Sequence, residues 1–155
     1  MSSGATTKSV TVSLVGCKEL EKPVGEEDGD FATLRCAPTI SGWTVQIDYD
    51  DSRESITLLR NGREYPLDLW RVVDGRFSHV GKIFEFRFRN GKPVAGIVRF
   101  NHVIDDNNTQ VSNLVVVRLA PTPCVARVVP PSEGASQNSK ARTIADRVER
   151  YACIR

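Results

Sequence analysis

The chain has 155 residues, of which 40% are hydrophobic and 26% are charged. These proportions match globular domains and argue against a disordered chain, a fibre or a membrane-embedded protein. The net charge of +2 is too small to indicate nucleic-acid binding, and no apolar run approaches the roughly 20 residues of a membrane span. We expect a flexible tail at 1–8 and one domain at 9–155, with no cofactor needed for folding.

Alternating apolar and polar residues predict strands in the first part of the chain. The first begins near Val10 and ends near Cys17, and an acidic segment rich in proline and glycine follows as a surface loop at 18–30. Two further strands are predicted at 31–36 and 43–49. The second of these places four apolar side chains on one face: Trp43, Val45, Ile47 and Tyr49.

The dipeptide Asn61-Gly62 predicts a hairpin at 54–69, because a two-residue type I′ turn favours this pair. If the strands pair directly across the turn, Leu58 faces Tyr65 on an apolar side. The register then separates a core face from a polar face, which supports it.

A second Asn-Gly pair, Asn90-Gly91, predicts a hairpin in which Phe86 lies opposite Ala95. Phenylalanines and charged residues then take opposite faces, namely Phe84, Phe86 and Phe88 against Glu85, Arg87 and Arg89. Rings mixed with arginines also suggest an RNA-binding sheet, but plain strand alternation explains them more simply. The pattern leaves open whether the phenylalanine face is core or a partner surface.

The last third of the chain changes from strand to helix. An apolar run at 114–119 predicts a buried strand, and prolines confine 125–129 to a short or edge strand. Apolar residues at helical spacing then predict a helix at about 139–152: Ala141, Ile144, Ala145, Val148 and Ala152. The expected fold is α+β and mostly β, an antiparallel sheet of seven to nine strands forming a sandwich or partial barrel with one C-terminal helix.

Four cysteines occur without a CxxC motif: Cys17, Cys36, Cys124 and Cys153. Disulfides explain this set better than free buried thiols or a zinc site. Three pairings exist, and we favour Cys17–Cys36 with Cys124–Cys153, because each closes a modest loop. Disulfides indicate an oxidising compartment, so we expect a periplasmic or secreted protein whose native signal peptide is removed from this form of the chain.

Local signals for catalysis or metal binding are weak. His79 and His102 lie outside any metal-ligand spacing, and 48–59 starts like a calcium loop but lacks its glycine and final glutamate. Paired carboxylates of a hydrolase have no local signature. We therefore expect no catalytic, metal or cofactor residues and favour the irregular loops at 71–81 and 105–112 for binding. The candidate binding residues are Arg71, Asp74, Arg76, Phe77, Ser78 and His79.

A pattern spread over most of the chain comprises Cys17, Arg35-Cys36, Ser41-Gly42-Trp43, Asp51-Ser52-Arg53, the stretch 94–99, Cys124, Ala141-Arg142, Ile144-Ala145-Asp146 and Cys153. It resembles a group of small secreted proteins of alphaproteobacteria whose function is unassigned. The resemblance implies a periplasmic or secreted location with two disulfides, and it brings no catalytic residues.

A second likeness runs from Cys36 to Leu69 and on to Phe86 and includes Tyr65-Pro66-Leu67. This part is similar to the membrane-bound C-type lysozyme inhibitor domain, a small β-barrel that inserts a Ser-Ala-x-Gly loop into lysozyme. The corresponding segment here, 72–78, lacks that motif. We expect a non-enzymatic binding or interaction module. Its partner is unknown from the sequence; a protein or an envelope component is expected, and a nucleic acid is not. A lysozyme-inhibitor-like protein and an envelope hydrolase using carboxylates are the alternatives.

Overall fold

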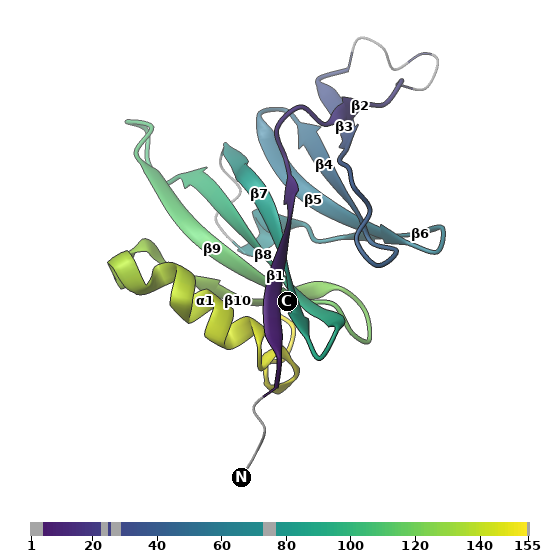
Figure 1. Cartoon of the computed structure of the whole chain (residues 1–155). Helices are drawn as coiled ribbons and strands as arrows, with labels where there is room; N and C mark the ends of the chain where they lie inside the picture. The colour runs from purple at the N-terminus through teal and green to yellow at the C-terminus, as the bar shows by residue number, and fades with distance from the viewer. Residues whose placement is uncertain (1–4, 23–24, 26–28, 73–76, 155) are drawn as a thin grey trace.

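The computed structural model describes residues 5–22, 25, 29–72 and 77–154. Within these ranges the chain is mostly β, with one α-helix near the C-terminus (Figure 1). The strands are β1 Thr7–Ser13, β2 Lys18–Glu19, β3 Phe31–Arg35, β4 Thr44–Asp50, β5 Arg53–Arg60, β6 Arg63–Pro66, β7 Ser78–Arg89, β8 Lys92–Val103, β9 Gln110–Arg118 and β10 Cys124–Val129. The helix is α1 Gln137–Ala145, and the 3-10 segments are η1 Leu69–Val72, η2 Pro131–Ser136 and η3 Val148–Arg150.

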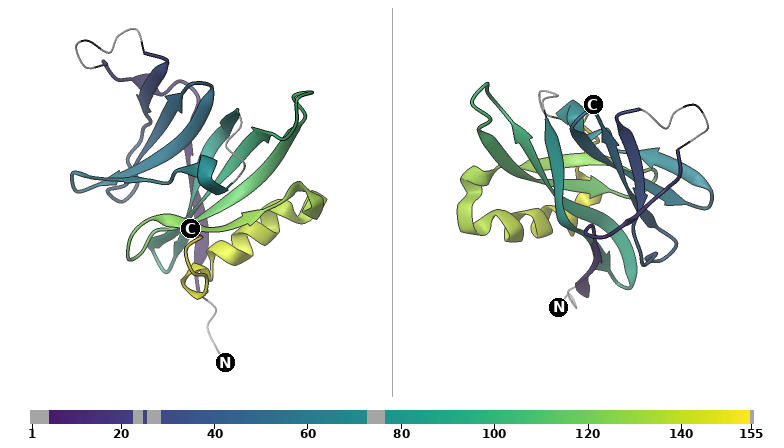
Figure 2. Two further views of the ribbon diagram at one scale, coloured as in Figure 1. Left: turned by 180° about the vertical axis from the view of Figure 1, so that it is seen from behind. Right: turned by 90° about the horizontal axis from the view of Figure 1, so that it is seen from above.

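The strands form one mixed sheet. Its order is β10-β9-β8-β7-β5-β4-β3-β2, with β1 paired to β7 and β6 paired to β5. The β5–β7 pair is parallel, through Arg53 and Ser78, and the other pairs are antiparallel. Figures 1 and 2 show that the sheet bends strongly, with β3 to β6 on one side and β8 to β10 with α1 on the other, and that it does not close.

Three expectations about the elements need correction. The described sheet has ten strands and is mixed, rather than seven to nine and antiparallel; the additional strand is β2, whose two residues are too few to show alternation. Strand β1 begins at Thr7, inside the segment expected as a tail. The helix begins at Gln137 and ends at Ala145 instead of covering about 139–152, because the backbone of Arg147 leaves the helical region at φ −127°.

Strand β7 explains the bend. One of its edges pairs with β8 along most of its length. Its other edge pairs with β5 only at Ser78 and with β1 from Ile83 onward. The sheet therefore splits on this edge, with β5 diverging to one side and β1 to the other, and the stretch between Ser78 and Ile83 lies at the opening.

Two apolar cores lie on opposite faces of β8 and β9. The main core joins these strands to β1, β4, β5 and β7, and it contains Phe84 and Phe86, both 0% exposed. The phenylalanine face is thus core. The second core packs the helix residues Ala141 and Ile144 against Ile97 and neighbouring side chains of β8 to β10. Burial of this kind stabilises by about 25 cal/mol per Å² of apolar surface.

The first Asn-Gly hairpin has the predicted register. Leu58 pairs with Tyr65, and Asn61 and Gly62 both have positive φ, as the type I′ turn requires. The second hairpin turns at Asn90-Gly91 as predicted, but its register is wrong by one residue: Phe86 lies opposite Gly96 instead of Ala95. A bulge in β8 causes the shift, because Arg87 pairs with Ala95 and Phe88 with Pro93, which leaves Val94 without a partner on β7.

The bulge decides which side chains of β8 face the main core. It places Gly96 against the Phe84 ring, where a Cβ atom on residue 96 would lie 2.3 Å from a ring carbon. Ala95 and Ile97 consequently face α1. Glu85 and Arg87, expected on a wet face, lie on this helix-covered side.

The disulfides are Cys17–Cys36 and Cys124–Cys153, the pairing favoured from the sequence. The first joins the segment after β1 to the end of β3, and the second ties the chain beyond η3 back to the start of β10. No helix in the described ranges is long and apolar enough to cross a bilayer. Two disulfides fit an extracellular or periplasmic protein.

Candidate functional site

The loop residues nominated from the sequence fall in different places. Arg71 lies in η1, and its exposed guanidinium is 3.9 Å from the Asp68 carboxylate. Asp74 and Arg76 lie outside the described residues. Phe77 immediately precedes β7, while Ser78 and His79 are its first residues. Only Phe77, Ser78 and His79 can therefore be placed at a common site.

The structure brings the two nominated loops together. The Val103 amide donates a hydrogen bond of 3.0 Å to the Phe77 carbonyl, and Ser78 pairs with His102 across β7 and β8. The turn after β8 is held by the Asp105 carboxylate, which accepts hydrogen bonds of 3.0 Å from the amides of Asn107 and Thr109. Segments that are separate in sequence thus share one end of the sheet.

A cavity of about 220 Å³ lies at this end. We call it the rim cavity, and its lining includes Tyr49, Glu54, Phe77, Ser78, His79 and His102. A neighbouring cavity of about 310 Å³, the outer cavity, shares Phe77 and Val103 with it and reaches Asp105 and Asp106. A third cavity of about 700 Å³, the back cavity, shares Glu54 and His79 with the rim cavity.

Exposed apolar side chains gather around these cavities. Phe77 is 52% exposed and Tyr49 is 37% exposed beside the rim cavity, and Ile104, which follows β8, is 43% exposed. Val15 and Ile83 line the back cavity and are 66% and 46% exposed. Single exposed apolar residues need no explanation, but a group of them beside connected cavities is typical of a binding surface.

His102 is the least expected member of the rim cavity. Its side chain is 8% exposed, its ring stacks on Phe100 at 6.3 Å between centroids, and its Nε2 atom lies 3.0 Å from the Asn113 amide nitrogen. Its Nδ1 atom is buried and has no hydrogen-bond partner within the described chain. Sequence reasoning did not nominate His102 for the site, because His102 and Asn113 meet only through the pairing of β8 with β9.

The back cavity contains the groups that a carboxylate-using hydrolase would need, namely Glu54, His79 and Glu85. Both carboxylates are already engaged. The Val80 amide donates a hydrogen bond of 2.8 Å to Glu54 Oε1, which links β7 to β5 beside their pair at Ser78. Glu85 is held by groups from β1 and α1.

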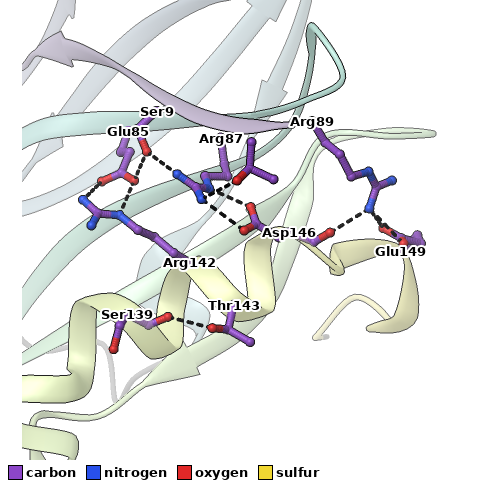
Figure 3. A network of polar contacts seen from close by, with 10 residues as sticks. Ser9, Glu85, Arg87, Arg89, Ser139, Arg142, Thr143, Asp146 and Glu149 are labelled. Carbon is purple, nitrogen blue, oxygen red and sulfur yellow. Dashed lines mark hydrogen bonds and ion pairs between the residues drawn. The ribbon is translucent and has the colours of Figure 1, made fainter. Parts of the chain in front are cut away.

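These contacts of Glu85 belong to a ladder of ion pairs between β7 and the C-terminal segment (Figure 3). Arg142 Nε donates to Glu85 Oε2 at 2.8 Å. Arg87 donates two hydrogen bonds, of 2.6 and 3.1 Å, to the Asp146 carboxylate. Arg89 donates to Glu149 at 3.0 Å. The ladder fixes α1 and η3 on the sheet.

Burial raises the pKa of Glu85, but hydrogen bonds from Arg142 and Ser9, with the charges of Arg142 and Arg87, outweigh it and leave the pKa below its ordinary value of 4.5. The Ser9 hydroxyl donates to Glu85 at 2.5 Å, so β1 joins the same group. Glu85 in turn raises the pKa of Arg142. A carboxylate that stays charged is a poor proton donor, so Glu85 is suited to a structural role.

We predict that the ladder makes stability depend on acid pH. The Glu85 carboxyl binds a proton at higher pH in the unfolded chain than in the folded one. Its contribution to the free energy of unfolding is therefore complete above pH 4.5 and is lost as the pH falls through the lower pKa of the folded state. At pH 7, Glu85→Gln should lower the free energy of unfolding by about 1–2 kcal/mol. Urea unfolding of both proteins between neutral and acid pH measures this, and the difference should shrink below the ordinary pKa.

Glu133→Gln is the matched control, because Glu133 pairs with the half-exposed Lys140. Glu133→Gln should lower the free energy of unfolding by less than about 0.5 kcal/mol. If the free energy of unfolding falls equally steeply with decreasing pH in the wild type and in Glu85→Gln, Glu85 is not the source of the pH dependence.

Other acidic groups considered from the sequence have structural partners. Asp48 accepts hydrogen bonds from Gln46 and Thr57 within the sheet, and Asp105 closes its own turn. In the part of the chain that the structure describes, no three His, Cys, Asp or Glu side chains are grouped so that they could hold a metal ion.

No family model, curated protein or solved structure matches this chain. The two resemblances stated from the sequence stay predictions, and the site rests on its own geometry.

Proposed function

We propose that this protein is a non-enzymatic binding module of the periplasm or the extracellular space, and that it contacts its partner through the rim cavity. The observation that carries the proposal is the pair of exposed rings, Phe77 and Tyr49, beside a cavity whose lining also includes the polar side chains of Glu54 and His79. Apolar walls with a few placed polar groups are what ligand sites require.

Binding explains the site better than catalysis does. In the back cavity, hydrogen bonds from Arg142 and Ser9 keep Glu85 charged, and hydrolysis by paired carboxylates needs one that can release a proton. Glu85 is therefore a poor proton donor for the hydrolase hypothesis. The lysozyme-inhibitor hypothesis depends on the segment 72–78, which lacks the Ser-Ala-x-Gly motif and of which 73–76 lie outside the described residues.

The scaffold suits presentation of a rigid surface in an oxidising compartment. Phe77 is held by the Val103 amide at the start of the long strand β7, which lies inside the sheet. The disulfides lie away from this end and can persist outside the cytoplasm. We keep the periplasm or secretion as the expected location and a protein or envelope component as the expected partner.

Affinity selection followed by mass spectrometry tests the proposal without a known partner. The folded protein is mixed with an extract of small molecules and peptides, recovered by size exclusion, and its retained compounds are identified. We expect the wild type to retain compounds that a Phe77→Ser, Tyr49→Ser double variant loses, because that variant removes the exposed rings and leaves the core unchanged.

Ile154→Ser is the matched control, since Ile154 is 41% exposed and lines none of the three cavities. Retention should survive this change. Equal retention by the rim variant and the wild type would overturn the assigned surface, and chemical conversion of a retained compound would favour the hydrolase alternative.

A further inference from the structure

The back cavity, to which the proposed function assigns no ligand, contains an arginine without a carboxylate partner. Arg99 lies on β8, is half-buried and lines this cavity of about 700 Å³. Its Nη1 atom donates hydrogen bonds to Ser112 Oγ at 2.8 Å and to Gln137 Oε1 at 3.1 Å, and both acceptors are uncharged. No acidic side chain of the described residues forms an ion pair with Arg99. Its charge is therefore left for a ligand.

The two hydrogen bonds also decide which edge of the guanidinium is free. Nη1 carries two hydrogens, and Ser112 and Gln137 accept one each. Nε and Nη2 remain, and their N–H groups lie parallel along one edge, the arrangement that binds both oxygens of a carboxylate. These two atoms are accessible, because the buried side-chain nitrogens and oxygens that lack a partner in the described chain do not include those of Arg99.

The cavity lies on the β7 side of Arg99. A Cβ atom on Gly81 of β7 would lie 2.9 Å from Arg99 Cβ, so residue 81 approaches the arginine closely and has no side chain to cover it. Gly81 and Ile83 line the cavity, whereas Ser112 and Gln137 hold Nη1 from β9 and α1. The free edge of Arg99 therefore adjoins the open space over β7.

The other charged groups that line the cavity permit a negative ligand at this position. Lys82 adds a second cation, and no acid is paired with it among the described residues. Glu85 is compensated by Arg142 at 2.8 Å. Glu54 belongs to β5, which lies on the far side of β7 from β8, and His79 adds no negative charge in either protonation state. Two uncompensated cations thus stand against one carboxylate.

Most of the remaining wall is apolar. Val15 and Ile83 are 66% and 46% exposed beside the cavity, and an apolar chain that covered them would be stabilised by leaving water. The volume of about 700 Å³ falls within the range of about 300–1,000 Å³ that is usual for ligand sites. The buried apolar residues of the wall are Leu14, Ile47, Ile97 and Leu114.

We propose that the back cavity binds a carboxylate carried on an apolar body. The two oxygens accept hydrogen bonds from Nε and Nη2 of Arg99, and the body lies against Val15 and Ile83. A fatty acid and the apolar C-terminus of a peptide both have this chemistry. Phe77 and Tyr49 do not line the back cavity, so this site and the contact proposed at the rim cavity can fail independently.

Titration of the intact protein, followed by NMR of the arginine Nε–H groups and the backbone amides, tests the proposal. The probes are octanoate, N-acetyl-leucyl-leucine for the peptide source, octanol as the chain without a carboxylate, and acetate as the carboxylate without a chain. We expect octanoate or the peptide to shift the Arg99 Nε–H signal and the amides of Gly81 and Ile83. Octanol and acetate should bind about tenfold or more weakly. The tighter of the two larger carboxylates identifies the source.

Arg99→Gln removes the charged edge and should weaken binding of the responding probe about tenfold or more. Arg118→Gln is the matched control, because Arg118 also donates to uncharged acceptors, the carbonyls of Ala120 and Tyr151, and does not line the back cavity. The control should bind as the wild type does. Unchanged binding by Arg99→Gln would overturn the assignment.

The wild-type titration decides the matter even if Arg99→Gln does not fold. Octanol that binds as tightly as octanoate, or an Arg99 Nε–H signal that neither larger carboxylate moves, would overturn the proposal. The Phe77→Ser, Tyr49→Ser double variant should still bind the responding probe. Loss of the probe in this variant would place the carboxylate in the rim cavity and overturn the back-cavity site, while leaving the proposed function in place.

Discussion

Gly96→Ala is expected to destabilise the protein by about 3 kcal/mol. The added Cβ would lie 2.3 and 2.4 Å from two carbons of the Phe84 ring, closer than atoms can approach without movement. Phe84 is 0% exposed in the main core and touches Phe86 with 4.9 Å between ring centroids. The ring cannot move outward, so either β8 or the core must shift. Urea unfolding of the variant measures the loss.

A double variant separates this clash from a general effect of losing glycine. Phe84→Leu removes part of the ring near residue 96, so adding Gly96→Ala to Phe84→Leu should cost much less than in the wild type. The coupling should be about 1–2 kcal/mol, as found for residues in direct contact. Equal costs in both backgrounds would contradict the packing of Gly96 on Phe84.

Removal of the Cys124–Cys153 disulfide by two serine substitutions should lower the free energy of unfolding by about 3 kcal/mol. The bridge spans 29 positions and restricts the unfolded chain. It also holds the C-terminal segment near β10, where the Ile154 amide donates to the Val125 carbonyl at 2.7 Å. Equilibrium unfolding without reductant is the measurement.

The ladder on β7 predicts how this variant fails. Arg87 still binds Asp146, so α1 should stay on the sheet while residues after η3 exchange their amide hydrogens faster. The Cys17–Cys36 bridge spans 19 positions, and its removal should cost a similar amount without affecting α1 or its exchange. A loss below about 1 kcal/mol for Cys124 and Cys153 would contradict the expected role of the bridge.

The predictions that proved correct concern features that depend mainly on residues close together in the sequence. Asn61-Gly62 determines its own turn, and the register of Leu58 with Tyr65 follows from it. The C-terminal helix was found from its apolar spacing, although its end was not, because its termination depends on Arg147 and on the return of the chain to Cys124. The pairing of the cysteines followed from the preference for modest loops.

Features that depend on distant contacts could not be predicted. The register of the second hairpin depends on a bulge that places Gly96 over Phe84, and the local sequence does not mark it. Glu85 meets Arg142 across 57 positions, so the charged face was expected to be wet. At the site, both loops were nominated, but their meeting through Phe77 and Val103 and the burial of His102 needed the sheet topology.

The most direct test of the binding surface is a fragment screen followed by amide NMR of the labelled wild-type protein. Small apolar and polar fragments find the surface that a protein uses for binding, because such sites combine apolar walls with unused hydrogen-bonding groups. We predict that the largest shift changes cluster at Tyr49, Phe77, Ser78, His102 and Val103. Fragments that leave these residues unshifted would contradict the account.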